Sequence, residues 1–368
     1  MKVVQFVPSL DSGGVEQGVI EIAKALVEDN HESHVVSSGG RLVDDLISSG
    51  SHHHKWDLGK KSLLNLRLIK PLRNWIVSTQ PDIIHVRSRM PAWLVWKALN
   101  GIPQSQRPQL VSTVHGLHSV NFYSRVMTKP HNIIAVSQSS KNYIIDNYTK
   151  SENKNIKLIY RGVDSPNYNK DYAPSDKWLS DWYEQYPETK SAKLLTISGR
   201  ISPLKDIEKI IHLAKSIKDN SSHNFKILIA GEAQNKHLKY LKNLKNTIKY
   251  LGLSEDIYFL NFRKDIKDIY AISSLAFNTS NKPESFGRSV LEPLSMGVPT
   301  IGYNRGGVKE ILDELYPFGG VTPGSDEQLL NKTLCILDGN EANIKTNTKF
   351  ITSKMCSETL SFYKEILS

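Results

Sequence analysis

KPESFGRSVLEPLSMGVPTIG, residues 282–302, is the stretch from which the fold of this chain can be worked out. Pro283 biases the residue before it away from helical geometry, and Ser285 is a residue type that caps helices. The residues that follow predict a helix. It should end just before Gly297, because glycine fits the left-handed turn that closes many helices. Residues 298–301 then predict a short buried strand. Helix and buried strand in succession are typical of an α/β sheet.

This stretch also carries two carboxylates, Glu284 and Glu292. Glu284 lies at the predicted helix entrance. It is followed by four residues whose backbone amides precede the first helical hydrogen bonds, Ser285, Phe286, Gly287 and Arg288. Unpaired amides and the helix dipole favour phosphate or sugar hydroxyls, and Gly287 leaves room for a close approach. We expect Pro293 to bend the helix, which would turn Glu292 toward the same pocket. The alternative is that Glu284 only complements the dipole and Glu292 is solvated.

Glu284 and Glu292 are separated by seven residues, and Ser-Phe-Gly follows the first of them. This pattern resembles the donor-site signature of retaining glycosyltransferases of family 4, the glycogen-synthase-like group. The resemblance implies the GT-B fold, an α/β architecture of two Rossmann-like, doubly wound domains facing a cleft. It also implies a C-terminal helix that crosses back to the N-terminal domain.

Composition agrees with a two-domain globular protein. The 368 residues suffice for two full cores, and the hydrophobic and charged contents of 39% and 23% are ordinary. Cys335 and Cys356 form no metal spacing or disulfide framework, which favours a reducing cytoplasm. We expect no signal peptide and no membrane-spanning segment. The net charge of +10 favours an anionic partner. Nucleic acid is not expected, because no nucleic-acid-binding motif appears.

Apolar runs and helical periodicity alternate along the chain. Strands are predicted at residues 2–7, 34–37, 53–57, 82–86, 109–114, 132–136 and 156–160, then at 194–198, 225–230, 257–261, 274–278 and 298–302. Helices are predicted between them, at 15–29, 41–49, 62–78, 91–99, 121–128, 139–148, 204–219, 236–251, 265–271 and 307–313. Such alternation predicts parallel sheets covered on both faces.

The predicted domains follow from this alternation and from one segment that breaks it. Residues 1–165 form an N-terminal Rossmann-like acceptor domain, completed by a C-terminal helix at about 350–368. Residues 166–190, rich in Pro, Tyr, Asp and Ser, read as a linker. Residues 191–349 form the nucleotide-sugar donor domain.

SGRISPLKD, residues 198–206, follows the first strand of the donor domain. Gly199 permits a close approach, and Arg200 and Lys205 can converge on a pyrophosphate. Cleaving a nucleotide sugar builds negative charge on the leaving phosphate, which a metal or fixed cations must stabilise. The chain has no Asp-x-Asp motif. We therefore expect no metal, and the resemblance gives this task to Arg200 and Lys205.

SLDSGGVEQG, residues 9–18, follows the first strand. Gly13 and Gly14 allow a tight turn into a helix that offers amides to an anion. It is neither the dinucleotide fingerprint nor a P-loop. The resemblance places these glycines near the donor phosphate and Glu16 near the acceptor.

His115 and the loop after residue 86 are the other candidates in the first domain. The resemblance places the His115 imidazole near the reacting carbon of the donor sugar. Arg87 and Arg89, with Ser88 between them, suit phosphate or carboxylate recognition, and they resemble the acceptor side of lipopolysaccharide-core members. The alternatives are a structural histidine and a solvated loop.

Smaller matches are Glu232, in Ala-Gly-Glu after a strand, and Arg263, where relatives hold the base through backbone groups. Two positions depart from the family pattern. Arg161 stands where Asn is usual before Gly-Val, which leaves the contact at the domain hinge open. Asn261 stands where glycine is usual, which leaves the base pocket open.

Residues 52–75 mix six cations with Trp56, Trp75 and several leucines. The cations are Lys55, Lys60, Lys61, Arg67, Lys70 and Arg73. A basic amphipathic segment with tryptophans favours an anionic membrane surface. The alternative is an ordinary surface helix.

Together these features predict a retaining, metal-independent hexosyltransferase without a cofactor. It would move a sugar from a UDP- or GDP-linked donor to a lipopolysaccharide-core or other lipid-linked acceptor, and we expect it in the cytoplasm, peripheral on the inner membrane face. The resemblance implies that Glu284 positions the sugar and that Glu292 binds the ribose. The alternatives are a two-domain ligand-binding protein and an NAD-type oxidoreductase.

Overall fold

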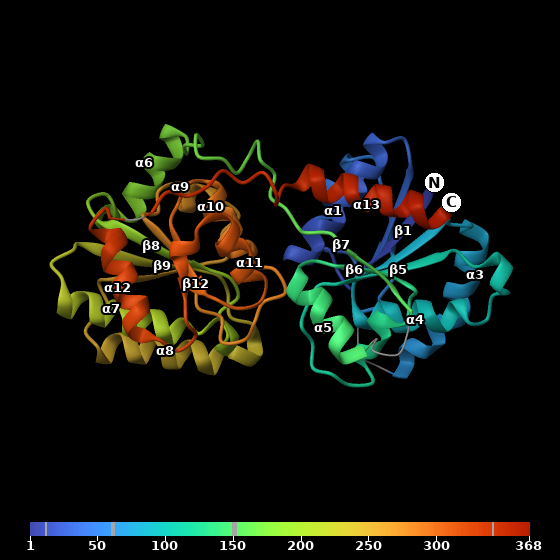
Figure 1. Ribbon diagram of the computed structural model, residues 1–368, viewed down its shortest axis with the longest axis horizontal. Helices are drawn as coiled ribbons and strands as arrows, with labels where there is room; N and C mark the ends of the chain where they lie inside the picture. The colour runs from blue at the N-terminus through green and yellow to red at the C-terminus, as the bar shows by residue number, and fades with distance from the viewer. Residues whose placement is uncertain (12, 60–62, 149–152, 341) are drawn as a thin grey trace. The chain divides into compact units, whose positions relative to one another are not determined.

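The computed structural model describes residues 1–368 except 12, 60–62, 149–152 and 341. The chain forms two compact units (Figure 1). Unit 1 contains Met1–Gly162 together with Thr352–Ser368, and unit 2 contains Val163–Ile351. Within the described residues, no helix is long and apolar enough to cross a membrane.

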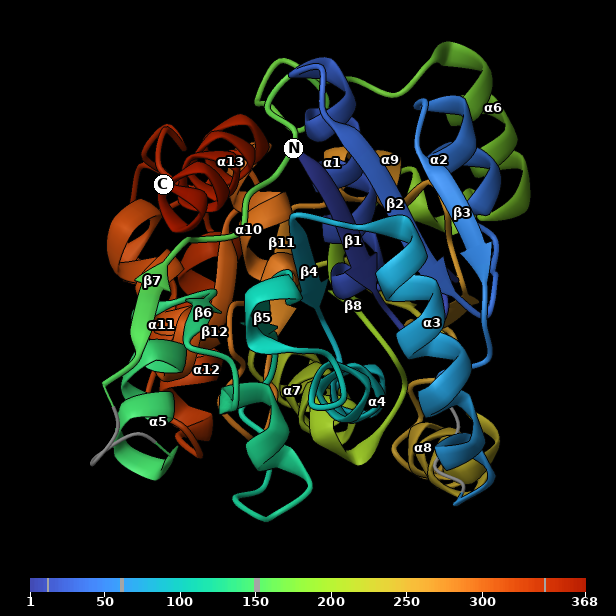
Figure 2. The same cartoon turned by 90° about the vertical axis from the view of Figure 1, so that its right-hand side faces the viewer.

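Unit 1 is built on a seven-stranded sheet with the strand order β3-β2-β1-β4-β5-β6-β7, which Figure 2 shows from right to left. All of the strand pairs are parallel. The strands are β1 (Lys2–Phe6), β2 (Glu32–Ser37), β3 (His52–Lys55), β4 (Ile83–Val86), β5 (Gln109–Val114), β6 (Asn132–Ala135) and β7 (Asn155–Leu158). The four residues of β4 are all buried, as expected for a parallel strand covered on both faces.

Helices connect the strands of unit 1. They are α1 (Gly14–Glu28), α2 (Val43–Ser48), α3 (Ile69–Thr79), α4 (Arg89–Leu99) and α5 (Gln138–Tyr148), with 3₁₀ turns at Leu63–Leu68, Gln104–Gln106 and Ser124–Thr128. The last helix of the chain, α13 (Thr352–Leu367), packs against α1 (Figure 1). Its buried side chains, Met355, Leu360 and Phe362 among them, join Ile22 and Leu26 of α1 in one core cluster. The predicted return of the C-terminal helix is confirmed.

Unit 2 has a six-stranded parallel sheet with the order β10-β9-β8-β11-β12-β13. The strands are β8 (Lys193–Ser198), β9 (Phe225–Ala230), β10 (Ile257–Asn261), β11 (Leu275–Asn278), β12 (Thr300–Tyr303) and β13 (Gly320–Val321). The helices are α6 (Asp176–Gln185), α7 (Ile207–Asn220), α8 (Leu238–Tyr250), α9 (Ile266–Ala271), α10 (Arg288–Ser295), α11 (Gly306–Leu315) and α12 (Asp326–Leu337), with 3₁₀ turns at Pro187–Thr189, Pro203–Lys205, Asn235–His237 and Pro317–Gly319.

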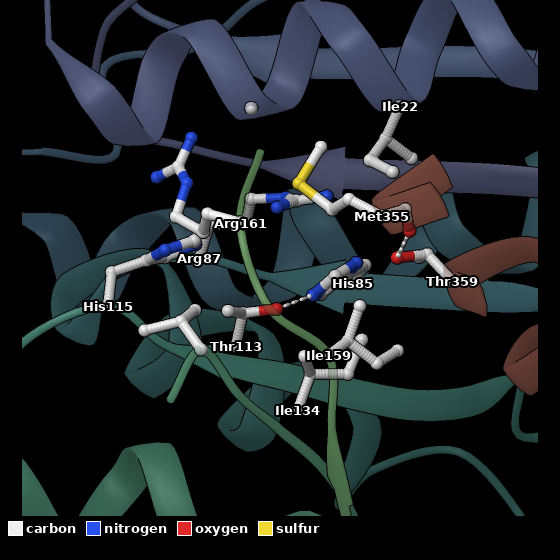
Figure 3. Close-up of a pocket in the computed structure, with 12 residues that line it drawn as sticks. Ile22, His85, Arg87, Thr113, His115, Ile134, Ile159, Arg161, Met355 and Thr359 are labelled. Atoms are coloured by element: carbon white, nitrogen blue, oxygen red, sulfur yellow. Dashed lines mark hydrogen bonds between the residues drawn. The ribbon is translucent and has the colours of Figure 1, made fainter. Parts of the chain in front are cut away.

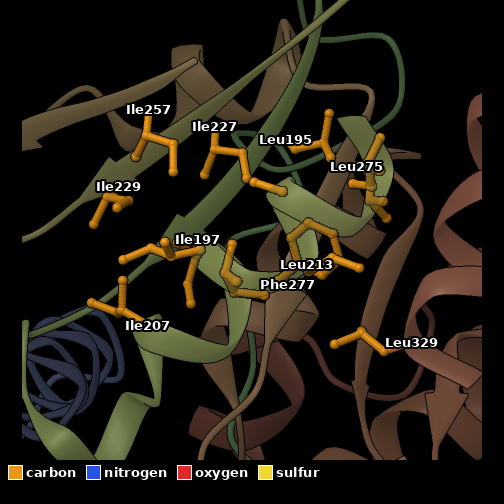
Figure 4. Close-up of a cluster of buried hydrophobic side chains, with 14 of the residues drawn as sticks. Leu195, Ile197, Ile207, Leu213, Ile227, Ile229, Ile257, Leu275, Phe277 and Leu329 are labelled. Carbon is orange, nitrogen blue, oxygen red and sulfur yellow. The ribbon is translucent and has the colours of Figure 1, made fainter. Parts of the chain in front are cut away.

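One apolar cluster forms the main core of unit 2. Alternate residues of neighbouring strands, such as Leu195, Ile197 and Ile227, meet the apolar face of α7 (Figure 4). Ile207, Ile210 and other buried residues of α7 recur every three or four positions, the spacing that places them on one side of a helix. This packing fixes the loops that leave the carboxyl ends of the strands.

The segment 166–190, for which the sequence predicts a linker, packs within unit 2. Trp182 of α6 is buried, and it lies in one cluster with Leu194 and Leu228 of the sheet. Its ring also stacks on Trp178, with 5.2 Å between the ring centroids. The aromatic residues of this polar segment therefore anchor it to the sheet of unit 2. The cleft between the two domains stays a prediction.

Candidate active site

The loop that follows β8 depends on two glycines. The chain leaves the strand at Gly199, whose φ of 130° is a conformation that side chains other than glycine rarely adopt. Gly231 follows β9, and a Cβ atom there would lie 1.8 Å from the carbonyl oxygen of Gly199. The two strand-end loops thus approach each other backbone to backbone. This approach sets the path of the chain toward Arg200, which is exposed, and toward Lys205.

Glu284 is the centre of a polar cluster in unit 2. Three groups donate hydrogen bonds to its Oε1 atom: Lys205 Nζ at 2.6 Å, Asn278 Nδ2 at 3.1 Å and Ser280 Oγ at 2.5 Å. No donor in the described part of the chain binds Oε2. About a fifth of the side chain is exposed, 21%. One oxygen of the carboxylate is therefore held in place, and the other is available to a ligand.

The electrostatics keep Glu284 ionised. Burial raises the pKa of this carboxyl, but the charge of Lys205 and the hydrogen bonds from Lys205, Ser280 and Asn278 outweigh burial, so the pKa lies below its ordinary value. The sequence predicts both Lys205 and Glu284 as site residues, and the structure brings them together. It does not predict Asn278 or Ser280. The signal available for them is their place at the end of β11, because polar residues that end parallel strands often face a site.

The helix after Glu284 starts later than the sequence predicts. α10 begins at Arg288, and the residue before it is Gly287 with φ 121° rather than a serine cap. The prediction of Ser285 as the cap is wrong, because the chain first turns to bury Phe286, whose ring packs against Phe350. As predicted, Gly297 adopts a positive φ, 77°, after the helix.

Glu292 pairs with Arg288 on the same helix face. Arg288 Nε donates to Glu292 Oε1 over 2.8 Å, and the Glu292 side chain is 12% exposed. It is therefore not the solvated residue of the alternative interpretation. The pKa of the buried Tyr270 hydroxyl lies well above its ordinary value because of burial and, next, the charge of Glu292. Since this hydroxyl lies 2.5 Å from Ser198 Oγ, Glu292 is close to the end of β8.

Of the two smaller candidates in unit 2, Arg263 is held by an acidic neighbour and Glu232 is exposed to solvent. Arg263 forms two hydrogen bonds to Asp265, Nε to Oδ1 at 2.8 Å and Nη2 to Oδ2 at 2.5 Å. Glu232 is exposed, and its carbonyl oxygen accepts the amide of Ile201 at 2.9 Å. Asn261, for which the resemblance predicts a glycine position, adopts a positive φ of 57°. Asparagine tolerates that conformation, so the backbone here keeps a glycine-like turn.

In unit 1, α1 begins at Gly14, and Gly13 precedes it with φ 145°. A Cβ atom on Gly13 would lie 2.6 Å from Glu16 Oε2. The carboxylate of Glu16 therefore lies over the turn, where it is favourable to the helix dipole.

A pocket of unit 1 collects His115 and Arg87. Its volume is about 300 Å³, counting the part open to solvent. Figure 3 shows the side chains of Arg87, Arg161 and His115 on one side of it, with His85 and Thr113 beside them. His85 bonds to Tyr363 Oη at 2.5 Å and to Thr113 Oγ1 at 2.6 Å.

Arg87 and Arg89, in the loop after β4, lie in different surroundings, and the loop is not simply solvated. Arg87 is buried in this pocket, 5% exposed. Arg89 is the first residue of α4, after Ser88, and its Nη1 donates to Ser124 Oγ at 3.1 Å. The sequence predicts Arg87 and His115 as site residues but not the approach of Arg161, which the fold brings in from the end of β7.

Residues 52–75 differ from the predicted membrane-facing helix. Trp56 and Trp75 pack against the core of unit 1, with the Trp75 ring 6.3 Å from that of Phe6. The tryptophans therefore do not form an outward apolar face. Arg67 and Lys70 are exposed, whereas Lys60 and Lys61 lie outside the described residues.

Within the described residues, no group of three or more His, Cys, Asp or Glu side chains is placed to hold a metal ion.

Comparison with known proteins gives two matching family models. Residues 12–165 match the model described as Glycosyltransferase Family 4, and residues 180–352 match the model described as Glycosyl transferases group 1. N-acetyl-alpha-D-glucosaminyl L-malate synthase of Bacillus anthracis is 24% identical, over 98% of this chain and 95% of that protein.

Solved structures match along the whole chain. The glycosyltransferase of Rickettsia africae ESF-5 has a TM-score of 0.84 and 26% identity, over 100% of this chain and 98% of that one. Anabaena Alr3699/HepE, solved in complex with UDP-glucose, has a TM-score of 0.82 and 22% identity, over 99% and 100%. The predicted GT-B fold of two Rossmann-like domains is confirmed.

Proposed function

The chain belongs to the retaining glycosyltransferases of family 4, and from this premise we propose that it moves a hexose from a UDP- or GDP-linked donor to a lipid-linked surface glycan, such as a lipopolysaccharide core. The observation that carries the proposal is the Glu284 carboxylate, held on Oε1 by Lys205, Asn278 and Ser280, with Oε2 available. Carboxylate oxygens accept hydrogen bonds from sugar hydroxyls strongly.

The roles in the donor site follow from charge and position. Arg200 and Lys205 would neutralise the diphosphate as the glycosidic bond breaks. Glu284, with the amides of Phe286 and Gly287, would position the transferred sugar. Glu292 would accept hydrogen bonds from the ribose, and Arg288 would hold Glu292 in place through their 2.8 Å bond.

UDP is the first donor nucleotide to test, since a structural relative was solved with UDP-glucose. In unit 1, a neutral His115 would support the reacting face of the sugar. Burial and, next, the charges of Arg161 and Arg87 hold the pKa of His115 well below its ordinary value. The imidazole thus stays uncharged at neutral pH.

The test is a thermal-shift screen with UDP, GDP and ADP, followed by single-turnover release of nucleoside diphosphate from the matching sugars. We expect one nucleotide to stabilise the protein and its sugar to be cleaved in the presence of EDTA. Loss of turnover in EDTA would contradict a mechanism based on fixed cations.

The acceptor and membrane parts of the proposal rest on charge. The net charge is +10, and Arg67 and Lys70 are exposed beside Leu66, which is 52% exposed. We expect peripheral binding to anionic vesicles. Vesicle flotation of a variant with Lys60, Lys61, Arg67 and Lys70 reversed to Glu tests it, and unchanged flotation would remove this segment from the proposal.

A further inference from the structure

The pocket of unit 1 lies where ligands of parallel sheets bind. It is lined from the carboxyl ends of neighbouring strands: His85 and Arg87 come from β4, Thr113 and His115 from β5, and Arg161 from the chain after β7. Helices α1 and α13 cover it through Gly18, Ile22, Met355 and Thr359. Crevices at the carboxyl ends of strands are the usual ligand sites of open α/β sheets.

The charges in this pocket are of one sign. Arg87 and Arg161 are 5% and 7% exposed. Among the described residues that line the pocket there is no Asp or Glu. Burial lowers the pKa of Arg87, and the groups that oppose this effect are Tyr363, Cys356 and Glu21. Two guanidiniums are thus buried among the residues that line the pocket, and Glu21, the carboxylate that acts on Arg87, is not one of those residues.

Arg87 also retains hydrogen-bonding capacity. Its Nε and Nη2 atoms are buried, and no acceptor among the described residues bonds to them. A buried donor without an acceptor costs roughly 1–3 kcal/mol, and more when the donor is charged. A ligand that brings oxygen acceptors and negative charge removes both costs together.

A glycine makes room for the second guanidinium. Gly18 lies within α1, and a Cβ atom there would meet Arg161 Nη2 at 2.6 Å. Glycine inside a helix costs about 0.5–1 kcal/mol relative to alanine.

The two histidines of the pocket add no charge. Burial holds the pKa of His85 and of His115 well below the ordinary value. The charge of Arg87 lowers both pKa values further, and the charge of Arg161 lowers that of His115. Neutral imidazoles can donate one hydrogen bond each. The positive charge of the pocket therefore comes from the arginines, which bind planar and tetrahedral oxyanions through paired N–H groups.

We propose that Arg87 and Arg161 form an oxyanion site in unit 1, which binds the carboxylate or phosphate group of an anionic acceptor. That the anion belongs to the acceptor rests on the proposed function. The site itself rests on the pocket alone.

The direct test is a titration with inorganic phosphate and with malonate, at constant ionic strength, followed by thermal unfolding and calorimetry. We expect either anion to raise the melting temperature of the wild type by about 2 °C or more at saturation. Arg87→Met and Arg161→Asn should weaken binding roughly tenfold or more. Arg87→Lys should retain part of the anion binding, because lysine keeps the positive charge but lacks the paired N–H donors of the guanidinium.

Two further variants serve as controls. Arg41→Met removes an exposed arginine of unit 1 and should leave the response unchanged. Gly18→Ala keeps both charges but displaces Arg161, and should weaken anion binding while the protein remains folded in anion-free buffer. Equal phosphate binding by the wild type, Arg87→Met and Arg161→Asn would overturn the site.

The source of the anion is tested with hydroxylated anions. L-malate and glycerol 3-phosphate are incubated with the donor, and glycosylated product is measured by mass spectrometry. Product that disappears in Arg87→Met supports the acceptor assignment. Phosphate binding without product from these probes would overturn that assignment and leave the site to a free anion. UDP binding, measured separately, should be unchanged in Arg87→Met, so failure of the donor site is distinguishable.

Discussion

At the carboxyl ends of their parallel strands, the two units place charged side chains in different surroundings. In unit 2, Lys205 meets Glu284 at 2.6 Å, and Arg288 meets Glu292 at 2.8 Å. In unit 1, Arg87 and Arg161 line a pocket whose described lining has no carboxylate. Lys205 and Arg288 are thus paired with carboxylates within unit 2, whereas Arg87 in unit 1 keeps buried N–H groups to which no acceptor among the described residues bonds.

This difference determines how each region can meet a ligand. A paired cation and carboxylate are held in position before the ligand arrives, so little reorganisation is needed when charge develops. A buried guanidinium with unbonded N–H groups, such as Arg87, carries an unfavourable energy that an anion relieves on binding.

Removing the paired groups of unit 2 should have the largest effect. We expect Lys205→Met and Glu284→Gln each to lower donor cleavage about 10²–10³-fold, since each removes a group aimed at the reacting donor. Single-turnover release of nucleoside diphosphate measures it. The matched control is Lys215→Met, because Lys215 is a half-exposed lysine that pairs with Asp219 on α7. Activity within twofold of wild type in either site variant would contradict the account.

A glycine from each unit provides the second comparison. A Cβ on Gly231 meets a backbone oxygen at 1.8 Å, whereas one on Gly18 meets the end of the Arg161 side chain at 2.6 Å. We expect Gly231→Ala to destabilise unit 2 by about 2–4 kcal/mol, because backbone cannot yield as a side chain can. Gly18→Ala should be neutral or stabilising by up to about 1 kcal/mol. Urea unfolding measures the free energy of unfolding of both variants. Equal losses of stability would contradict the difference between a backbone contact at Gly231 and a side-chain contact at Gly18.

The stability effects of single charges should have opposite signs in the two units. Lys205→Met leaves Glu284 without its cation and should cost about 1–3 kcal/mol. Arg87→Met removes a buried cation from the pocket and should be neutral or stabilising in anion-free buffer. Thermal unfolding in a zwitterionic buffer without phosphate distinguishes them. A loss in Arg87→Met as large as in Lys205→Met would show that the Arg87 charge is satisfied within the protein.

The free energy of unfolding should also depend on pH differently in the two units. The folded pKa of His85 and His115 lies below the unfolded value, so the unfolded state binds more protons as pH falls below about 6.5. Each histidine then reduces stability by about 1.4 kcal/mol per pH unit. Glu284 has a lowered pKa, so its contribution is present above about pH 4.3 and is lost only as pH falls through the lowered value.

Unfolding of the wild type and His115→Gln between pH 8 and 5 measures this dependence. The variant should show a shallower loss of stability below about pH 6.5. An identical slope in both proteins would mean that His115 does not stay neutral in the folded state.

Most of the fold could be predicted from the sequence, because buried parallel strands are short apolar runs that local patterns reveal. β13, Gly320–Val321, is too short for such a run and is missed. α12 is also missed, although Ser325 caps it by accepting the Gln328 amide at 3.3 Å. The capping serine was the available signal there.

The site could be predicted in part. Lys205 and Glu284 follow from local motifs, but their ion pair depends on how the strand ends of one sheet align. The burial of Arg87 and its approach to Arg161 cannot be read locally either, because these residues follow different strands and the space for Arg161 is set by Gly18 on α1. Local sequence shows which groups end the strands, and the tertiary packing decides which of them meet.

The most direct measurement is a crystal structure with the nucleoside diphosphate that the thermal screen selects. The account predicts diphosphate oxygens about 3 Å from the side chains of Arg200 and Lys205, with the ribose hydroxyls on Glu292. A nucleotide bound away from Arg200 and Glu292 would contradict it.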